Sequence, residues 1–200
     1  MIAGGRNQRF GANKALAKLA GKPLLLHVLD RAVSVADEVV VAIGKEDNPA
    51  SYSELVPKSV RILNDKMEDK SPLVGILTGF EVMKSQYSVV LSCDTPFVRT
   101  EILKLLFEKA GGYDAAIPMW PNQEIEPLQS VYKCKPAISG ARLALAEGGF
   151  RNADMIKRLA KVTYVPVEEI KPFDHDLITF FNVNTRADLQ RAEKMYDSVR

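Results

Sequence analysis

The chain has few of the residues that mark several large classes of protein. Its 200 residues include two cysteines, Cys93 and Cys134, which are far apart and form no Cys-x-x-Cys pattern. Neither a disulfide framework nor a cysteine-based zinc site is therefore expected. No apolar run reaches membrane-spanning length, and no charged-then-apolar signal segment is present. The formal net charge of +2 argues against binding of nucleic acid through a broad basic surface, so we expect a cytoplasmic protein that contacts neither membrane nor nucleic acid.

The order of patterns along the chain predicts an α/β fold. A chain of this length can bury a core without metals or disulfides, and we expect one domain over residues 1–200. Apolar, β-branched runs alternate with helical patterns, which is typical of a parallel sheet covered by helices. The expected strands are 38–43, 60–63, 88–93, 114–119, 128–132 and 163–167. The expected helices are 23–35, 72–84, 100–110, 137–147 and 185–197. Thr185 and Asp188 have the spacing of a capping box.

The most informative segment is residues 3–14, which combines paired glycines with two arginines and a lysine, and has no acidic residue in it or before it. Gly4 and Gly5 allow backbone N–H groups to turn toward an anion, while Arg9 and Lys14 supply countercharge. The spacing matches neither a Walker A loop nor Gly-x-Gly-x-x-Gly. The segment predicts a loop that holds the phosphates of a nucleotide. The simpler alternative is a glycine-containing turn with solvated basic residues.

The strand that should lead into this loop is almost absent, because only Met1 and Ile2 precede it. Either the first strand is very short, or the chain starts upstream of Met1, and the sequence leaves both readings open. The choice bears on how rigidly the glycine loop is anchored.

Acidic residues stand where two of the expected strands end. Asp94 follows the run 88–93, and Asp65 follows the run 60–63. Ligands of open parallel sheets bind beyond the carboxyl ends of the strands, where a carboxylate suits a hard cation such as Mg2+. The alternative for Asp94 is a cap on the following helix. Two aspartates in analogous positions favour a binding site.

Alternating asparagines precede the last expected helix. Asn182 and Asn184 are two residues apart on an extended segment, so both amides face the same side and can converge on one ligand or metal ion. The alternative is turn and helix-capping chemistry, which asparagine also favours. Thr185 already fits the cap, which leaves the asparagines less committed to it.

Gly75 lies within the first turn or so of an expected helix. A glycine there costs about 1 kcal/mol against alanine, so a ligand or a packed neighbour approaches the backbone closely. The sequence supports both explanations.

Together these motifs resemble the molybdenum cofactor guanylyltransferase family, within the wider group of Rossmann-like nucleotidyltransferases. The matching segments are Ala-Gly-Gly…Arg-Phe-Gly…Lys at 3–14, Gly-Lys-Pro-Leu at 21–24, Pro-Leu-Val-Gly at 72–75, Cys-Asp-Thr-Pro at 93–96 and Asn-Val-Asn-Thr at 182–185. The first and fourth are shared with other nucleotidyltransferases of this fold, and the last narrows the choice to the molybdenum cofactor branch. The resemblance implies a three-layer α/β, Rossmann-like nucleotidyltransferase fold with a mostly parallel central sheet.

The resemblance also implies a reaction, in which GMP is transferred from GTP to molybdopterin that carries molybdenum, with release of pyrophosphate. The implied nucleotide-binding residues are Ala3, Gly4, Gly5, Lys14, Asp65, Gly75 and Asp94. The implied catalytic residues are Lys14, Arg9 and Asp94, of which Asp94 also binds Mg2+. The implied substrate-binding residues, facing the metal and the pterin, are Asn182 and Asn184. The implied partners are GTP, molybdopterin with or without molybdenum, and proteins of molybdenum cofactor biosynthesis or molybdoenzyme maturation.

Two residues depart from the family pattern. Ser71 stands where glycine is common, and Ala42 stands where some members carry an asparagine in the nucleotide pocket, which leaves the choice of base open. A related enzyme that uses CTP or another phosphate acceptor therefore stays an alternative, as does a non-catalytic GTP-binding homologue. A sugar-transferring enzyme ranks last, because its usual Asp-x-Asp motif has only Asp174 and Asp176 as candidates, in a polar stretch that favours a loop.

Overall fold

The structure is a computed structural model that describes residues 1–4, 10, 13–67 and 71–198. Most of the expected strands form within a residue or two of their predicted positions. The strands of the central sheet are β3 (Val40–Ile43), β4 (Arg61–Asn64), β5 (Tyr87–Leu91), β6 (Ala115–Met119), β7 (Gln129–Lys133) and β8 (Val162–Pro166). Residues 1–4, which we call the N-terminal segment, lie in extended form between β3 and β5.

The central sheet is mostly parallel, as predicted. Its order is β4, β3, the N-terminal segment, β5, β7, β6 and β8. The pairs β3–β4 and β6–β8 are parallel, and Ile2 bridges in parallel to Ala42 on one side and Ser92 on the other. Among the described strands of this sheet, only β7 runs antiparallel to its neighbours. β7 follows β6 without an intervening helix, and a short return of this kind gives an antiparallel pair.

The N-terminal segment takes the place of a strand between β3 and the end of β5. The N–H of Ile2 donates to the carbonyl of Leu91 at 2.7 Å, and the N–H of Cys93 donates to the carbonyl of Ile2 at 3.0 Å. On the other side, the N–H of Ala3 donates to the carbonyl of Ala42 at 2.8 Å. The chain runs outward from this segment to β3 and β4, then returns to its other side at β5. This reversal makes the N-terminal segment the topological switch point of the sheet, where ligands of such folds bind.

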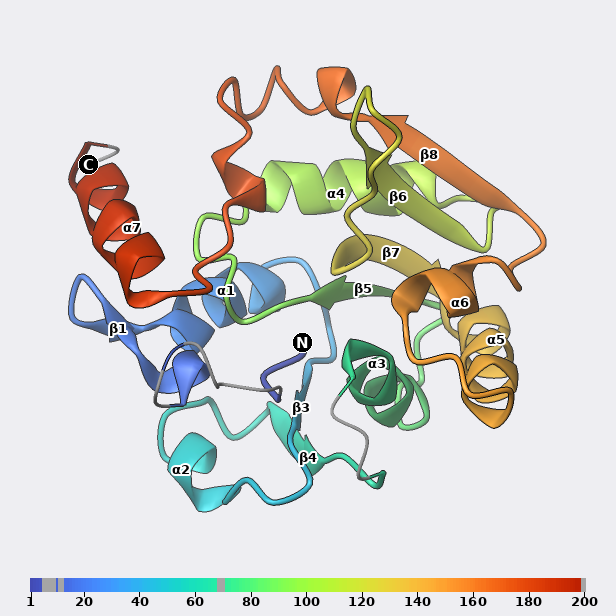
Figure 1. The fold of residues 1–200 in the computed structure, drawn as a ribbon, viewed down its shortest axis with the longest axis horizontal. Helices are drawn as coiled ribbons and strands as arrows, with labels where there is room; N and C mark the ends of the chain where they lie inside the picture. Colours follow the sequence, from blue (N-terminus) through green and yellow to red (C-terminus); the bar gives the residue numbers. More distant parts are fainter. Residues whose placement is uncertain (5–9, 11–12, 68–70, 199–200) are drawn as a thin grey trace.

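Helices cover both faces of the sheet and complete three layers (Figure 1). One face carries α1 (Leu24–Val33) and α4 (Thr100–Lys109), and the other carries α3 (Pro72–Phe80), α5 (Cys134–Ala146) and α6 (Asn152–Ile156). Successive side chains of a strand point to opposite faces. Accordingly Val41 and Leu91 pack with α1, while Ala42 and Val90 pack with α3.

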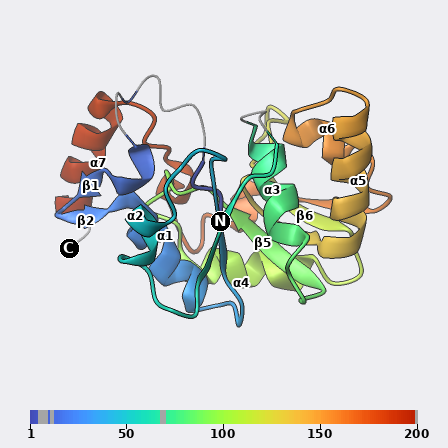
Figure 2. The same cartoon turned by 90° about the horizontal axis from the view of Figure 1, so that it is seen from below.

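Two smaller parts lie at the end of the sheet opposite α5 and α6. Figure 2 shows α7 (Arg186–Ser198) beside the hairpin of β1 (Lys18–Leu19) and β2 (Lys22–Pro23). The hairpin turns through Ala20 and Gly21, whose φ angles of 49° and 80° are those of a left-handed two-residue turn. The predicted capping box of α7 is confirmed, since the N–H of Thr185 donates to Asp188 at 2.9 Å and the N–H of Asp188 donates to the Thr185 hydroxyl at 3.1 Å.

Several short elements were not predicted from the sequence. They are the β1–β2 hairpin, α2 (Ala50–Ser53) and α6. Each is six residues or shorter and contains too few periodic positions to give a hydrophobic pattern. Among the helices within the described ranges, none is long and apolar enough to cross a membrane.

Gly75 has a packing explanation. It is buried on the side of α3 that faces the sheet, and a Cβ added to it would lie 3.0 Å from Cδ1 and 3.2 Å from Cγ2 of Ile2. The backbone of α3 therefore approaches the central segment closely at this point. The same helix contains Gly79, where an added Cβ would meet no heavy atom within 4 Å.

This difference gives a matched pair of substitutions in one helix. Alanine exceeds glycine in helix propensity by about 1 kcal/mol, so Gly79→Ala should raise the free energy of unfolding by up to that amount. Gly75→Ala should lower it, because overpacking a close contact costs about 1–3 kcal/mol. Urea unfolding of both variants tests this, and equal effects at the two positions would contradict the close approach of α3 to Ile2.

Candidate functional site

The candidate site lies along the carboxyl ends of the central strands. Gly4 ends the N-terminal segment, and Gly44, Asp65 and Asp94 come after β3, β4 and β5 respectively. Neighbouring strands are about 4.8 Å apart, so β4 and β5, with two strands between them, are separated by about 14 Å. Asp65 and Asp94 therefore lie at opposite ends of an edge that is long enough for a nucleotide. They are not two ligands of one metal ion.

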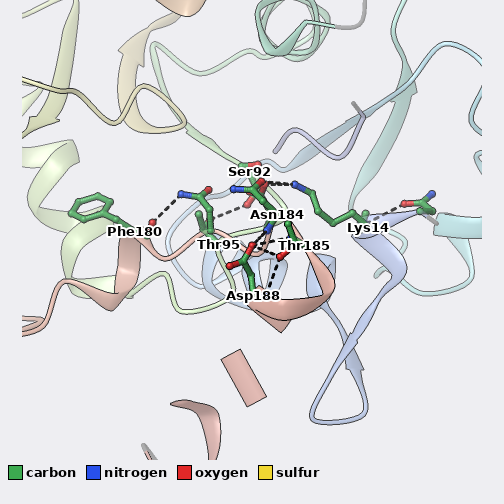
Figure 3. A network of polar contacts seen from close by, with 11 residues as sticks. Lys14, Ser92, Thr95, Phe180, Asn184, Thr185 and Asp188 are labelled. Carbon is green, nitrogen blue, oxygen red and sulfur yellow. Dashed lines mark hydrogen bonds and ion pairs between the residues drawn. The ribbon is translucent and has the colours of Figure 1, made fainter. Parts of the chain in front are cut away.

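A lysine, an aspartate and an asparagine from distant parts of the chain meet at the β5 end of this edge. Lys14 belongs to the short helix η2 (Lys14–Leu16), and its Nζ lies 2.5 Å from Oδ2 of Asp94 and 3.2 Å from Oδ1 of Asn184. Figure 3 shows the Lys14 side chain extending toward Asn184, with Asp188 and Thr185 below. The structure thus brings together three of the predicted site residues.

Asp94 is largely buried, and one of its two carboxylate oxygens has no hydrogen-bond partner among the described residues. Its side chain is 10% exposed, and Oδ1 is buried without a hydrogen-bond partner. Its carbonyl accepts the N–H of Val183 at 2.8 Å, which joins β5 to the segment before α7. Asp94 does not cap the next helix, because α4 begins at Thr100 with Arg99 as its N-cap.

This carboxylate fits Mg2+, which proteins usually bind through one or two carboxylates together with substrate phosphates. The unpartnered Oδ1 of Asp94 is an oxygen donor of the required kind. Within the described ranges no group of three or more His, Cys, Asp or Glu side chains could hold a metal ion by itself. The arrangement therefore suits a cation that arrives with a phosphorylated ligand.

The two asparagines have different surroundings. Val183 between them is buried, and both amides lie on the opposite, exposed side of the segment, as the alternation predicts. Asn184 bonds to Lys14, whereas the amide nitrogen of Asn182 donates to the carbonyl of Phe180 at 2.9 Å. Of the two, Asn184 is the one that contacts the Lys14–Asp94 pair.

The glycine loop begins with a very close backbone contact. A Cβ on Gly4 would lie 2.5 Å from the backbone nitrogen of Gly44, so no other residue fits without a backbone shift. The N–H groups of Ala3 and Gly4 both donate to the carbonyl of Ala42, at 2.8 and 3.2 Å, and so belong to the sheet. The predicted phosphate-binding residues Gly5 and Arg9 lie outside the described residues.

Asp65 is half-buried at the β4 end of the edge. Its N–H donates to the carbonyl of Ile43 at 2.9 Å, and its Oδ1 is buried without a partner. Burial raises the pKa of Asp65, against the effect of a hydrogen bond from Thr78, and the negative charge of Asp47 raises it further. A buried carboxylate oxygen of this kind suits the N–H or O–H donors of a ligand.

The remaining candidates do not join the site. Ala42 lies inside β3 with its side chain in the core, and Ser71 caps α3 by accepting the N–H of Val74 at 3.4 Å. Asp174 is buried and accepts the N–H of Thr179 at 2.7 Å, whereas Asp176 is exposed. The two aspartates therefore belong to a loop and do not face one common ligand. The thiol of Cys93 next to Asp94 is not a nucleophile, because burial raises its pKa to about 12.

Asn64, the last residue of β4, was not predicted from the sequence as a residue that shapes the site. Its amide nitrogen donates to the carbonyls of Asp47 at 2.8 Å and Gly44 at 3.0 Å, and so holds the loop that follows β3. A search for amides as well as carboxylates at strand ends would have found it.

The raised pKa of Asp65 predicts that its ionised carboxylate lowers the free energy of unfolding at pH 7. A group whose pKa is higher in the folded state than its ordinary value of 3.8 stabilises the fold when protonated, and this contribution is lost as the pH rises through the raised pKa. Asp65→Asn keeps the shape and removes the charge, so we expect a higher melting temperature at pH 7 and a smaller gain as the pH falls toward 4. The exposed Asp176→Asn is the control and should change the melting temperature little. A lower melting temperature for Asp65→Asn at pH 7 would contradict the prediction.

Comparison with known proteins places these features in a family. Residues 1–162 match the model of the MobA-like NTP transferase domain. A Methanosarcina mazei protein described as a probable molybdenum cofactor guanylyltransferase is 36% identical over 95% of this chain and 87% of its own length. A Natronomonas pharaonis protein with the same description is 31% identical over 97% of this chain and 95% of its own length.

Solved structures agree with this assignment. The crystal structure of molybdopterin-guanine dinucleotide biosynthesis protein A from Archaeoglobus fulgidus superposes with a TM-score of 0.80 at 29% identity, covering 98% of this chain and 97% of that one. The 2-C-methyl-D-erythritol 4-phosphate cytidylyltransferase of Thermus thermophilus superposes with a TM-score of 0.70 at 19% identity, covering 98% and 97%, which shows a shared fold. The chain therefore belongs to the family of MobA-like NTP transferase domains.

Proposed function

We propose that the protein is a molybdenum cofactor guanylyltransferase, which transfers GMP from GTP to molybdopterin carrying molybdenum and releases pyrophosphate. The observation that carries the proposal is the meeting of Lys14, Asp94 and Asn184 at the switch point of the sheet. Each of these residues comes from a different motif of the family. The relatives that bear this description match the chain over almost its whole length, so the proposal treats residues 1–200 as one nucleotidyltransferase domain.

The reaction exchanges one phosphoanhydride bond for another. An oxygen of the terminal phosphate of molybdopterin attacks the α-phosphorus of GTP. The bond between this phosphorus and the oxygen that bridges the α- and β-phosphates breaks, and pyrophosphate leaves with the electrons of that bond. Such a step needs little covalent help from the protein, so positioning and neutralisation of charge carry most of it.

Lys14 is placed to neutralise the charge that grows on the leaving pyrophosphate. Its ammonium group already faces a carboxylate and an amide oxygen, so it occupies a fixed position at the edge of the sheet. Arg9, by its place in the glycine loop, would act on the same phosphates. Asp94 would hold Mg2+ through its unpartnered Oδ1, and a bound Mg2+ would neutralise phosphate oxygens and align the reacting groups.

The other predicted residues would divide the edge of the sheet between GTP, which donates the GMP group, and molybdopterin, which accepts it. Asp65, about 14 Å away at the β4 end, would bind the nucleoside, next to Ala3, Gly4, Gly5 and the α3 turn that contains Gly75. Asn182 and Asn184 would face the metal and the pterin from the other side of Asp94. The expectation of a cytoplasmic protein belongs to the same proposal.

Loss of either charged residue should remove most of the activity. We expect Lys14→Ala and Asp94→Ala each to lower turnover of GTP and molybdenum-bearing molybdopterin by about 10²-fold or more, the scale for one lost charge-stabilising contact. The exposed Lys18→Ala, four residues from Lys14, is the control and should keep its turnover. Pyrophosphate release measures the rate, and circular dichroism checks that each variant is folded. Wild-type rates in Lys14→Ala or Asp94→Ala would overturn the assignment.

The choice of nucleotide is tested by thermal shift. A ligand that binds only the folded protein raises its stability, by about 2.7 kcal/mol at 100 times Kd. We expect GTP with Mg2+ to raise the melting temperature more than CTP or ATP. A preference for CTP would indicate the related cytidylyl-transferring enzyme, and a shift with GTP but no pyrophosphate release with any acceptor would indicate a non-catalytic homologue.

A further inference from the structure

A buried tyrosine hydroxyl lies directly behind the candidate site. Tyr52 belongs to α2 and is fully buried among core residues that include Ala15 and Cys93. Its hydroxyl accepts the amide of Asn13 at 2.7 Å and donates to Asp47 Oδ2 at 3.4 Å. Burial raises the pKa of Tyr52 to about 12, so the hydroxyl keeps the proton that it donates.

On one side, this hydroxyl fixes the residue before Lys14. Asn13 is the N-cap of η2, and its Oδ1 accepts the N–H of Ala15 at 3.1 Å. With its nitrogen bonded to Tyr52, the amide of Asn13 is held at both ends. The backbone from which the Lys14 side chain departs is therefore held from inside the core.

On the other side, the hydroxyl is tied to the loop against which Gly4 packs. Asp47 Oδ2 accepts the N–H of Gly44 at 2.9 Å, and Gly44 is the residue that leaves no room for a Cβ on Gly4. One hydroxyl thus connects Asn13, near the end of the glycine loop, to the loop 44–47, against which the start of the glycine loop packs.

We propose that Tyr52 is a positioning residue, whose hydroxyl holds Asn13 and the loop 44–47 so that Lys14 reaches its place at the phosphates. The inference rests on the function proposed above, because it takes Lys14 as the group that acts on the nucleotide. A tyrosine that only filled the core would need one partner for its hydroxyl. Tyr52 instead bonds to side chains from two site-forming segments.

A second buried tyrosine, Tyr132, provides a matched control for the loss of this hydroxyl. Tyr132 is also fully buried, and its hydroxyl donates to the carbonyl of Pro127 at 2.9 Å. Its backbone lies opposite Ser88 near the amino end of β5, away from the site. Tyr52→Phe and Tyr132→Phe each delete one buried hydroxyl and one donated hydrogen bond.

The experiment measures kcat and the KM for GTP with molybdenum-bearing molybdopterin as acceptor, well below the melting temperature. We expect Tyr52→Phe to lower kcat by about 10- to 100-fold and to raise the KM for GTP, because a misplacement of about 1 Å costs this much in rate and also weakens the contact of Lys14 with the bound phosphates. Tyr132→Phe should lose stability but keep kcat. Equal kcat values for Tyr52→Phe and Tyr132→Phe in a folded, active protein would overturn the proposal.

Two further variants show whether the effect passes through Lys14. Adding Tyr52→Phe to Lys14→Ala should lower kcat no further, since residues that act through one contact are not additive; an additional tenfold loss would overturn the proposal. Asn13→Ser keeps a good N-cap but is too short to reach Tyr52, so it should reproduce the loss of kcat even if Tyr52→Phe fails to fold.

The outcomes separate the two proposals. If wild-type protein gains stability with GTP but releases no pyrophosphate with any acceptor, the proposed function fails. The Tyr52 inference is then judged on binding alone, where Tyr52→Phe should reduce the GTP-induced thermal shift as Lys14→Ala does and Tyr132→Phe should not. An unchanged shift in Tyr52→Phe would overturn it independently of the reaction.

Discussion

The central sheet is continuous only because residues 1–4 hydrogen-bond to the strands on both sides. Ile2 exchanges backbone hydrogen bonds with Leu91 and Cys93, while Ala3 bonds to Ala42. These few bonds join the β3–β4 pair to the antiparallel and parallel strands beyond β5. The same four residues lead directly into the glycine loop. The loop therefore starts from an interior position of the sheet, between β3 and β5.

The small residues around the N-terminal segment follow from this position. Ile2 points to the α3 face, where it packs with Ala42 and leaves room for glycine alone at position 75. A Cβ at Gly75 would also lie 3.7 Å from the Cβ of Ala42. Position 42 is thus part of the packing beneath the site. The side chain of Ala42 therefore faces the core beneath α3.

The sequence predicted the strands, the long helices and the mostly parallel sheet well, because β-branched runs and helical periodicity are local signals. It also placed Asp65 and Asp94 at one edge of the sheet, because each follows an expected strand and carboxyl ends of parallel strands share one edge. The pairing of Lys14 with Asp94 joins residues 80 positions apart, so it depends on tertiary structure and leaves no local pattern in the sequence. Tyr52 was missed for a similar reason, because a tyrosine in the short polar stretch around α2 gives no periodic pattern, and its role depends entirely on tertiary neighbours.

The two strand-end aspartates show how one fold gives similar residues different tasks. Asp94 faces a lysine and keeps one oxygen unpartnered, so it can share a cation with phosphates while its charge stays compensated. Asp65 has no described cation beside it in its hydrogen bonds or ion pairs, and burial together with Asp47 raises its pKa. Moving a second Mg2+ to Asp65 would place a metal about 14 Å from Asp94, too far to act on the same phosphorus. In the proposed function, hydrogen-bond donors of the nucleoside would satisfy the buried Oδ1 of Asp65 instead, and they would fix the direction in which the nucleotide lies along the edge, with its phosphates toward Lys14.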